Sequence, residues 1–136
     1  MGRFLAIDFG EKRVGLALSD PTKIIAKPFK SITYTDHDDL LNQISLIIEE
    51  KNVEKIILGF PKGLKGENTA QTKKVMSFFN LIKNKSIIPI VLQDERFSSV
   101  SAKKSLILQN IKTGHNKSLI DETAAAIFLQ LYLDRK

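Results

Sequence analysis

Acidic residues occur next to three apolar segments of this sequence, at points where a carboxylate could do chemistry. Asp8 directly follows the apolar residues 4–7, Asp94 and Glu95 follow a later apolar segment, and Asp121 precedes an alanine-rich one. A strand that is apolar on both faces is typical of the covered centre of a sheet, and it has little reason to end in a carboxylate. We therefore interpret Asp8 as the anchor of an active site. The alternative is a turn aspartate that accepts hydrogen bonds from hairpin amides.

These carboxylates suit a hard divalent cation. The chain has no cysteine, and only His37 and His115 could supply imidazole, so a metal would be held mainly by oxygen ligands, as Mg²⁺ and Mn²⁺ prefer. Two such ions about 3.5–4 Å apart can activate water and stabilise the leaving oxygen of a phosphodiester. The residue types therefore suit a site for divalent cations, and such a site could assist the hydrolysis of a phosphodiester.

The later acidic residues also have structural interpretations. Ser118-x-x-Asp121 fits a capping box, in which Asp121 would serve the start of a helix. Asp94 and Glu95 could both be ion-paired at the surface. Alternatively, one of the two is a metal ligand and the other pairs with a nearby basic residue. The sequence leaves these choices open.

Basic residues exceed acidic ones, and this excess favours a polyanionic partner. The net charge is +6, with 21 Lys and Arg against 15 Asp and Glu. The loop 61–69 could bind phosphate through backbone amides at the start of the following helix, although its spacing is not that of a P-loop. A solvated loop is the alternative. The candidate phosphate contacts are Lys12, Lys62, Gly63, Lys65, Arg96, Lys112 and Lys117.

Apolar periodicity predicts the elements that must position these residues. The segments 3–9 and 13–20 flank a short polar turn and indicate a hairpin. Pro28 lacks an amide donor, so the strand that contains it should lie at a sheet edge, and Pro89 indicates the same for the last strand. The expected order is strands 3–9, 13–20 and 24–34, helix 36–52, strand 55–60, helix 70–83, strand 87–92, a helix that starts at Ser98 or Ser99, a loop over 109–117 and a helix from Ser118.

This order predicts a single α/β domain over residues 1–136. Three strands joined by short turns form an antiparallel meander, and two later strands arrive by helical crossovers and run parallel to the first. The result is a five-stranded mixed sheet with strand 3–9 in its centre and helices on both faces. Sites in such sheets lie beyond the carboxyl ends of the strands, so Asp8, the 61–69 loop and Asp94-Glu95 should converge there, and the last helix could bring Asp121 near Asp8.

Length and composition limit the remaining possibilities. The 136 residues suffice for one domain with a real core, and the absence of cysteine excludes a disulfide framework. No apolar run approaches the roughly 20 residues of a membrane span, and the chain enters a strand at once without an evident signal peptide. We expect a cytoplasmic protein that does not act in a membrane.

Four motifs together resemble the YqgF family of RNase H-like proteins. They are Ile7-Asp8-Phe9-Gly10 through Val14-Gly15, Gly59-Phe60-Pro61, Asp94-Glu95-Arg96-Phe97-Ser98-Ser99, and Ile120-Asp121-x-x-Ala124-Ala125. The resemblance runs through essentially the whole chain in order. Phe60 stands where the family often has leucine, which leaves the backbone role of the following loop intact.

The resemblance implies an RNase H-like sheet and a divalent-metal nuclease that matures the 5′ end of pre-16S ribosomal RNA. It implies Asp8, Glu95 and Asp121 as the acidic site. Holliday junction resolution is the alternative within this class, and a nucleic-acid-binding module that does not cleave is the alternative outside it. Asp8-x-Gly10 through Gly15 also resembles the phosphate-binding hairpin of actin-like ATPases, but those proteins need two such lobes.

Overall fold

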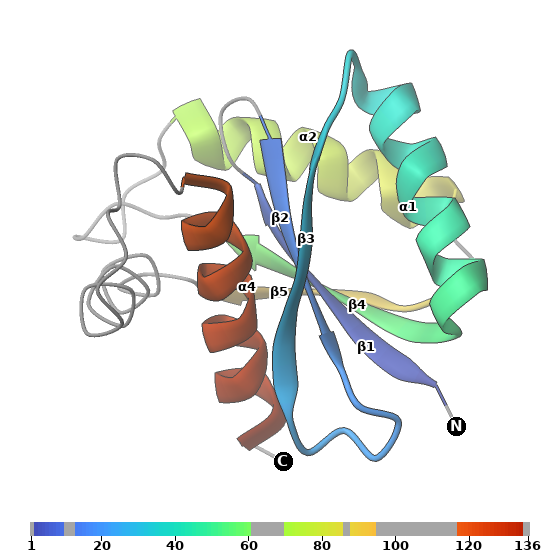
Figure 1. Cartoon of the computed structure of the whole chain (residues 1–136). Helices are drawn as coiled ribbons and strands as arrows, with labels where there is room; N and C mark the ends of the chain where they lie inside the picture. Colours follow the sequence, from blue (N-terminus) through green and yellow to red (C-terminus); the bar gives the residue numbers. More distant parts are fainter. Residues whose placement is uncertain (1, 10–12, 61–69, 86–87, 95–116, 135–136) are drawn as a thin grey trace.

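The computed structural model describes residues 2–9, 13–60, 70–85, 88–94 and 117–134, and within these ranges the predicted strands and helices are present. In chain order they are β1 (Arg3–Phe9), β2 (Arg13–Ser19), β3 (Ala26–Thr33), α1 (His37–Lys51), β4 (Val53–Phe60), α2 (Ala70–Lys85), β5 (Ile90–Asp94) and α4 (Lys117–Asp134). Figure 1 shows their arrangement. The helix expected after Ser98 or Ser99, and all but the last residue of the loop over 109–117, lie outside the described residues.

The five strands form one mixed sheet in the order β3-β2-β1-β4-β5, which puts β1 in the centre (Figure 1). β1 and β2 pair antiparallel, as do β2 and β3. β4 runs parallel to β1 and to β5. The predicted meander followed by two parallel crossovers is therefore confirmed.

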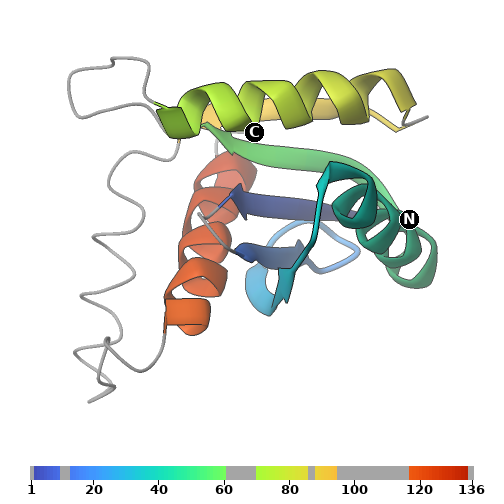
Figure 2. The same cartoon turned by 90° about the horizontal axis from the view of Figure 1, so that it is seen from above.

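Helices cover both faces of this sheet, as predicted (Figure 2). Leu5, Ile7 and Phe9 of β1 belong to a core that also includes residues of α1 and α2. Phe4 and Ala6 belong to a second core, formed with α4. Side chains along a strand alternate between faces, so the continuous apolar run of β1 is buried on both sides.

Both prolines lie at the sheet edges predicted for them. Pro28 is in β3, where the register with β2 shifts between Leu16 and Ala17, and Pro89 directly precedes β5. The last strand was predicted two to three residues too early. β5 pairs with β4 up to Phe60 opposite Asp94, so Asp94 is the last residue of the strand and does not lie beyond it.

The start of α1 is capped as the sequence predicts. Asp36 accepts a hydrogen bond from the backbone N–H of Asp39, which is one of the donors that a helix start leaves without an intrahelical partner. Asn52 ends the helix in the left-handed conformation, with φ of 55°. No described helix is both long and apolar enough to span a membrane.

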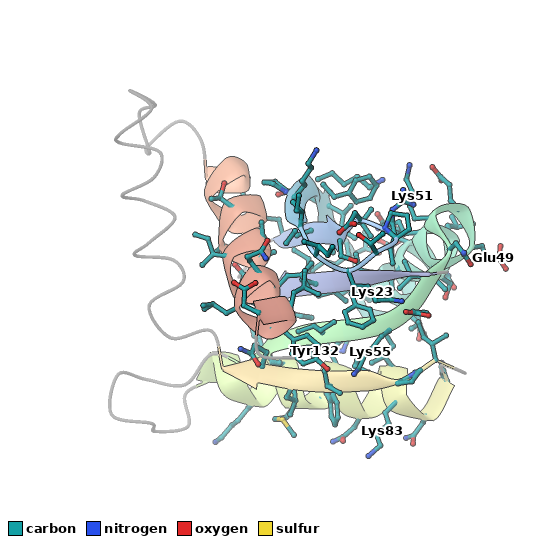
Figure 3. All side chains as sticks on the ribbon, turned by 90° about the horizontal axis from the view of Figure 1, so that it is seen from below. Lys23, Glu49, Lys51, Lys55, Lys83 and Tyr132 are labelled. Atoms are coloured by element: carbon teal, nitrogen blue, oxygen red, sulfur yellow. The ribbon has the colours of Figure 1, made fainter. Side chains whose placement is uncertain are left out.

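Aromatic and basic side chains meet at the amino end of β1. The Phe4 ring packs edge-on against Tyr132 of α4, with 6.0 Å between ring centroids. The ammonium groups of Lys23 and Lys55 lie 5.7 and 5.5 Å from the Phe4 ring centroid, and Lys55 also donates a hydrogen bond of 2.5 Å to the Tyr132 hydroxyl (Figure 3). These contacts bind the end of α4 to the amino end of the sheet.

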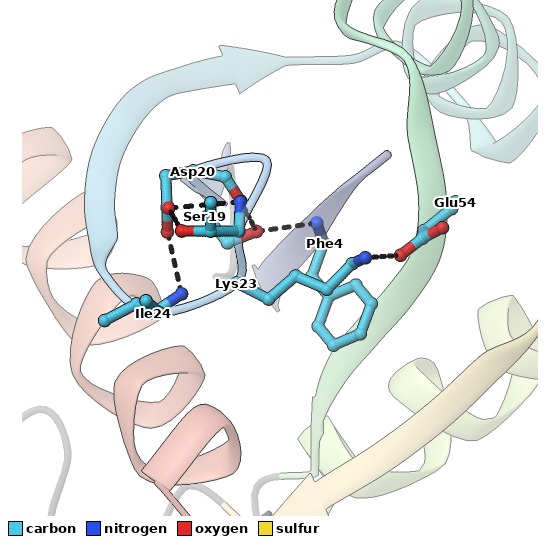
Figure 4. Close-up of polar contacts among 7 residues, drawn as sticks. Phe4, Ser19, Asp20, Lys23, Ile24 and Glu54 are labelled. Carbon is cyan, nitrogen blue, oxygen red and sulfur yellow. Dashed lines mark hydrogen bonds and ion pairs between the residues drawn. The ribbon is translucent and has the colours of Figure 1, made fainter. Parts of the chain in front are cut away.

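The β2–β3 loop at this end is held by one carboxylate. Asp20 accepts hydrogen bonds from the backbone N–H groups of Thr22, Ile24 and Ile25, at 3.1, 2.8 and 2.8 Å, and from the Thr22 hydroxyl. Figure 4 shows the contact between Asp20 and Ile24. These hydrogen bonds lower the pKa of Asp20 strongly, and the bond from the Ile25 N–H contributes most to this shift. The neighbouring Lys23 forms an ion pair with Glu54 and lowers the pKa of that carboxyl group.

Candidate active site

Asp8 lies near the carboxyl end of the central strand and is only 7% exposed. Strand alternation places it in the row of Phe4 and Ala6, on the face that α4 covers. A carboxylate in such a place is costly unless it is paired, hydrogen-bonded or bound to a metal. The position of Asp8 therefore agrees with its interpretation as the anchor of a site.

Glycines flank Asp8 on both neighbouring strands. Gly15 of β2 is its register partner, and on β4 Gly59 follows Leu58, the partner of Ile7. Neither glycine places a side chain beside the carboxylate. A buried carboxylate with no side chains on its two register neighbours fits a small, oxygen-liganded cation such as Mg²⁺ or Mn²⁺.

The direction of α4 follows from contacts at its carboxyl end. Tyr132 packs on Phe4 at the amino end of β1. At that same end, the Gln130 amide donates a hydrogen bond to the Ile24 carbonyl in the β2–β3 loop and accepts one from the N–H of Ala26 at the start of β3. The helix therefore runs antiparallel to β1. Its first turns lie at the carboxyl end of β1, where Asp8 is (Figure 1).

The helical repeat brings position 121 to the sheet-facing side of α4. Residues at spacings of 4, 7 and 11 from it are Ala125, Phe128 and Tyr132, all of which belong to or pack against the core on this face. Positions 121 and 132 are separated by about 16 Å of helix, and Phe4 and Asp8 by about 13 Å of strand. Position 121 is therefore near the level of Asp8 along the sheet.

The helix start also bears on the capping alternative for Asp121. α4 begins at Lys117 and has no acidic residue in its first turn, so Ser118 lies inside the helix and Asp121 beyond the first turn. The capping box is therefore not supported. The side chains of Lys117 and Asp121 lie outside the described residues.

β5 contributes a polar residue that the sequence analysis missed. Gln93 is 7% exposed, and strand alternation places it with Val91 on the α4 face of the sheet. Its position directly before Asp94 at the end of an apolar run was the available signal. Asp94 ends the strand, although its side chain is not described, and Glu95 lies outside the described residues.

The remaining predicted contacts cannot be placed. Lys12, Lys62, Gly63, Lys65, Arg96 and Lys112 all lie outside the described residues. Among the side chains that are described, no three of His, Cys, Asp or Glu gather closely enough to hold a metal ion. Of the three predicted ligands, Asp8 alone has a described side chain.

The arrangement of the sheet and helices is that of RuvC-like resolvases, which have an RNase H-like fold. Thermus thermophilus RuvC in complex with a Holliday junction substrate superposes with a TM-score of 0.63 at 10% identity, covering 99% of this chain and 96% of that chain. The fowlpox virus resolvase in complex with Holliday junction DNA gives 0.58 at 14% identity, covering 98% and 97%. At these identities the likeness shows the fold.

The chain belongs to the RuvX family, described as Holliday junction resolvase, whose model matches residues 2–135. A relative from Dictyoglomus turgidum, named "Putative pre-16S rRNA nuclease", is 42% identical over 97% of this chain and 94% of its own length. A relative of the same name from Desulforamulus reducens is 39% identical over 97% and 96%. The resemblance predicted from the sequence motifs is confirmed.

Proposed function

We propose that the protein is a divalent-metal-dependent nuclease that hydrolyses phosphodiester bonds in structured nucleic acid. One observation carries the proposal. The carboxylate of Asp8 is buried near the carboxyl end of the central strand, on the face against which α4 packs. Membership of the RuvX family and the names of its relatives support the same activity.

Asp8, Asp121 and Glu95 are the proposed ligands of one or two Mg²⁺ or Mn²⁺ ions. Side chains along a strand alternate between the two faces of the sheet. In β5, Val91 and Gln93 are on the α4 face, so continued alternation would put residue 95 there too and favours Glu95 over Asp94 as the ligand. When bound, such ions lower the pKa of a water molecule and stabilise the charge on the leaving oxygen.

The chain itself supplies orientation and charge. Asp8 is held by the most buried strand of the sheet, so its carboxylate is positioned before any ligand binds. The proposed phosphate contacts are Lys12, Lys62, Gly63, Lys65, Arg96, Lys112 and Lys117. Most of these follow the carboxyl ends of strands in the sequence, which is where sites form in open sheets.

The proposed physiological substrate is the 5′ end of pre-16S ribosomal RNA, in the cytoplasm. It rests on the names of the relatives, which are 35–42% identical to this chain. A Holliday junction is the second candidate substrate, because the family model carries that description. A module that binds nucleic acid without cleaving it is the alternative outside this class.

Glu95→Gln and Asp94→Asn form a matched pair that tests the site. Each change removes one formal charge by replacing the carboxylate with an amide of the same size. We expect Glu95→Gln to abolish Mn²⁺-dependent cleavage and Asp94→Asn to retain most of it. Equal loss in both variants, or loss in Asp94→Asn alone, would overturn the alternation argument.

The substrate is tested with the unmodified protein on two probes, a precursor 16S RNA fragment and a four-way DNA junction. Faster cleavage of the RNA, with kcat/KM as the measure, supports rRNA maturation. Preference for the junction selects the resolvase. Binding of both probes without cleavage in Mg²⁺ or Mn²⁺ would contradict the proposed activity.

A further inference from the structure

The two helices on one face of the sheet carry opposite charge. α2 contains four lysines and no acidic residue, whereas α1 contains four acidic residues and one lysine. Both pack on the core opposite α4 (Figure 2). α2 is therefore strongly positive, and a helix of one sign attracts a polyanion.

The solvent side of α2 is lined by hydrogen-bond donors. Its apolar side, with Val75, Phe78 and Ile82, is buried in the core. On the opposite side of the helix, four exposed polar residues follow one another at intervals of three or four positions and form one row: Lys73, Ser77, Asn80 and Asn84. Lysine, serine and asparagine are side chains that commonly contact phosphate oxygens.

The lysines beside this row are available for a ligand. Lys83 lies over the Phe79 ring, 5.6 Å from its centroid, so its stem is held against the helix while the side chain stays exposed (Figure 3). Lys85 has an ion pair with Asp38 at 3.7 Å. Within the described residues, Lys73, Lys74 and Lys83 have no ion pair.

α2 also extends away from the proposed site. α2 follows the carboxyl end of β4, which is the end of the sheet where Asp8 lies. Because β5 runs parallel to β4, α2 must return to the amino end of the sheet before β5 begins. Lys73 and Lys83 are separated by about 15 Å of helix. A duplex carries about nine phosphates over that length, at one per 1.7 Å of axis.

We propose that the solvent face of α2, from Lys73 to Asn84, binds the phosphate backbone of a duplex arm that leads away from the cleavage site. The inference rests on the proposed function in that the ligand is the nucleic-acid substrate. Because α2 lies on the opposite face of the sheet from Asp8, it contacts a different segment of the substrate from the one that is cleaved. A second copy of the chain that pairs α2 with α2 is disfavoured as occupant, since two α2 faces would repel each other.

The test compares two double variants with equal charge loss. Lys73→Gln with Lys83→Gln removes two charges from α2, and Lys27→Gln with Lys30→Gln removes two exposed charges from β3 at the sheet edge. The affinity for a fluorescent 24-base-pair duplex is measured from 50 to 300 mM KCl without divalent metal, so that binding is scored separately from cleavage. We expect the α2 variant to reduce the log–log salt slope by about 1.8, at 0.9 per phosphate contact, and the β3 variant to keep the parent slope.

An unchanged slope in the α2 variant, or equal losses in both variants, would overturn the inference. A change in the sedimentation coefficient of the α2 variant alone would also overturn it, because α2 would then be a self-association surface. Failure of the nuclease proposal would appear separately, as a parent protein that binds nucleic acid but does not cleave it with Mg²⁺ or Mn²⁺. Both variants should keep the parent melting temperature, because surface substitutions of this kind change stability little.

Discussion

The two ends of the sheet carry acidic residues in different settings. At the amino end, Asp20 accepts hydrogen bonds from three backbone N–H groups of its own loop, and Glu54 forms an ion pair with Lys23. At the carboxyl end, Asp8 lies within a buried strand, its register partner is a glycine, and two further acidic positions converge on that end in the proposed site.

This difference separates stabilising carboxylates from those suited to a cation. The charge of Asp20 is balanced by donors within six residues of chain, so it favours one loop conformation and has a lowered pKa. In the proposed site, the carboxylate of Asp8 would instead be joined by acidic residues from distant parts of the chain. Such an arrangement lowers the stability of the fold unless a cation compensates it.

The largest expected effect is the loss of cleavage in Asp8→Asn. The substitution keeps the size of the side chain and removes the formal charge that a divalent ion needs. Cleavage should fall about 10³-fold, because metal stabilisation of the reaction is worth several kcal/mol. The melting temperature without metal should hold or rise, since repulsion among carboxylates is relieved. Single-turnover cleavage and melting curves on the same preparation measure both.

The same substitution at the other end sharpens the comparison. Asp20→Asn should lower the melting temperature and leave the cleavage rate per folded molecule at the parent value. If Asp8→Asn were destabilised yet cleaved at the parent rate, Asp8 would be a turn residue and the contrast between the two ends would disappear.

Gly2→Ala should destabilise the amino end without touching the site. A Cβ at this buried position would lie 2.6 Å from the Cβ of Glu54 and 3.0 Å from the Asn52 carbonyl oxygen, so the backbone must shift. We expect a loss of about 1–3 kcal/mol in the free energy of unfolding, as for other overpacked sites. Urea denaturation measures it, and an unchanged midpoint would show that the amino end adapts freely.

Asp20 should contribute to the way the free energy of unfolding falls at acidic pH. Its pKa in the folded protein is below the ordinary value of 3.8, so the stability it contributes is complete above that value and is lost as the pH falls through the folded pKa. Between about pH 4 and pH 2 the parent should therefore lose more stability than Asp20→Asn. Equal losses of stability in the two proteins would show that the loop hydrogen bonds do not stabilise the ionised form.

Lys55→Met should have the smallest effect. It removes the hydrogen bond to Tyr132 and the contact with the Phe4 ring but keeps the apolar stem. We expect a loss of about 0.5–1 kcal/mol in unfolding free energy, typical of a partly exposed cation–π contact. A loss several times larger would mean that the end of α4 depends on this one side chain.

Local signals predicted much of this fold. The apolar run of β1 indicated burial on both faces, Pro28 and Pro89 indicated the two sheet edges, and Asp36 indicated the start of α1. Each of these depends on a few neighbouring residues or on one backbone donor. The order of the elements then left few topologies to consider.

Long-range features could not be predicted in this way. The bonds of Gln130 to Ile24 and Ala26 join residues more than 100 positions apart, and they fix the direction of α4. The apolar residues of α4 are spread around most of the helix circumference, so their spacing did not reveal which side of the helix faces the sheet. Gln93 was missed because its burial depends on how α4 covers β5.

A structure of the protein soaked with Mn²⁺ tests the central claim most directly. The anomalous signal of the metal locates each ion independently of the protein atoms. The account predicts at least one ion within about 2.0–2.4 Å of carboxylate oxygens of Asp8 and at least one of Glu95 and Asp121. An ion bound only elsewhere, or Asp8 bonded solely to protein donors at saturating Mn²⁺, would contradict the account.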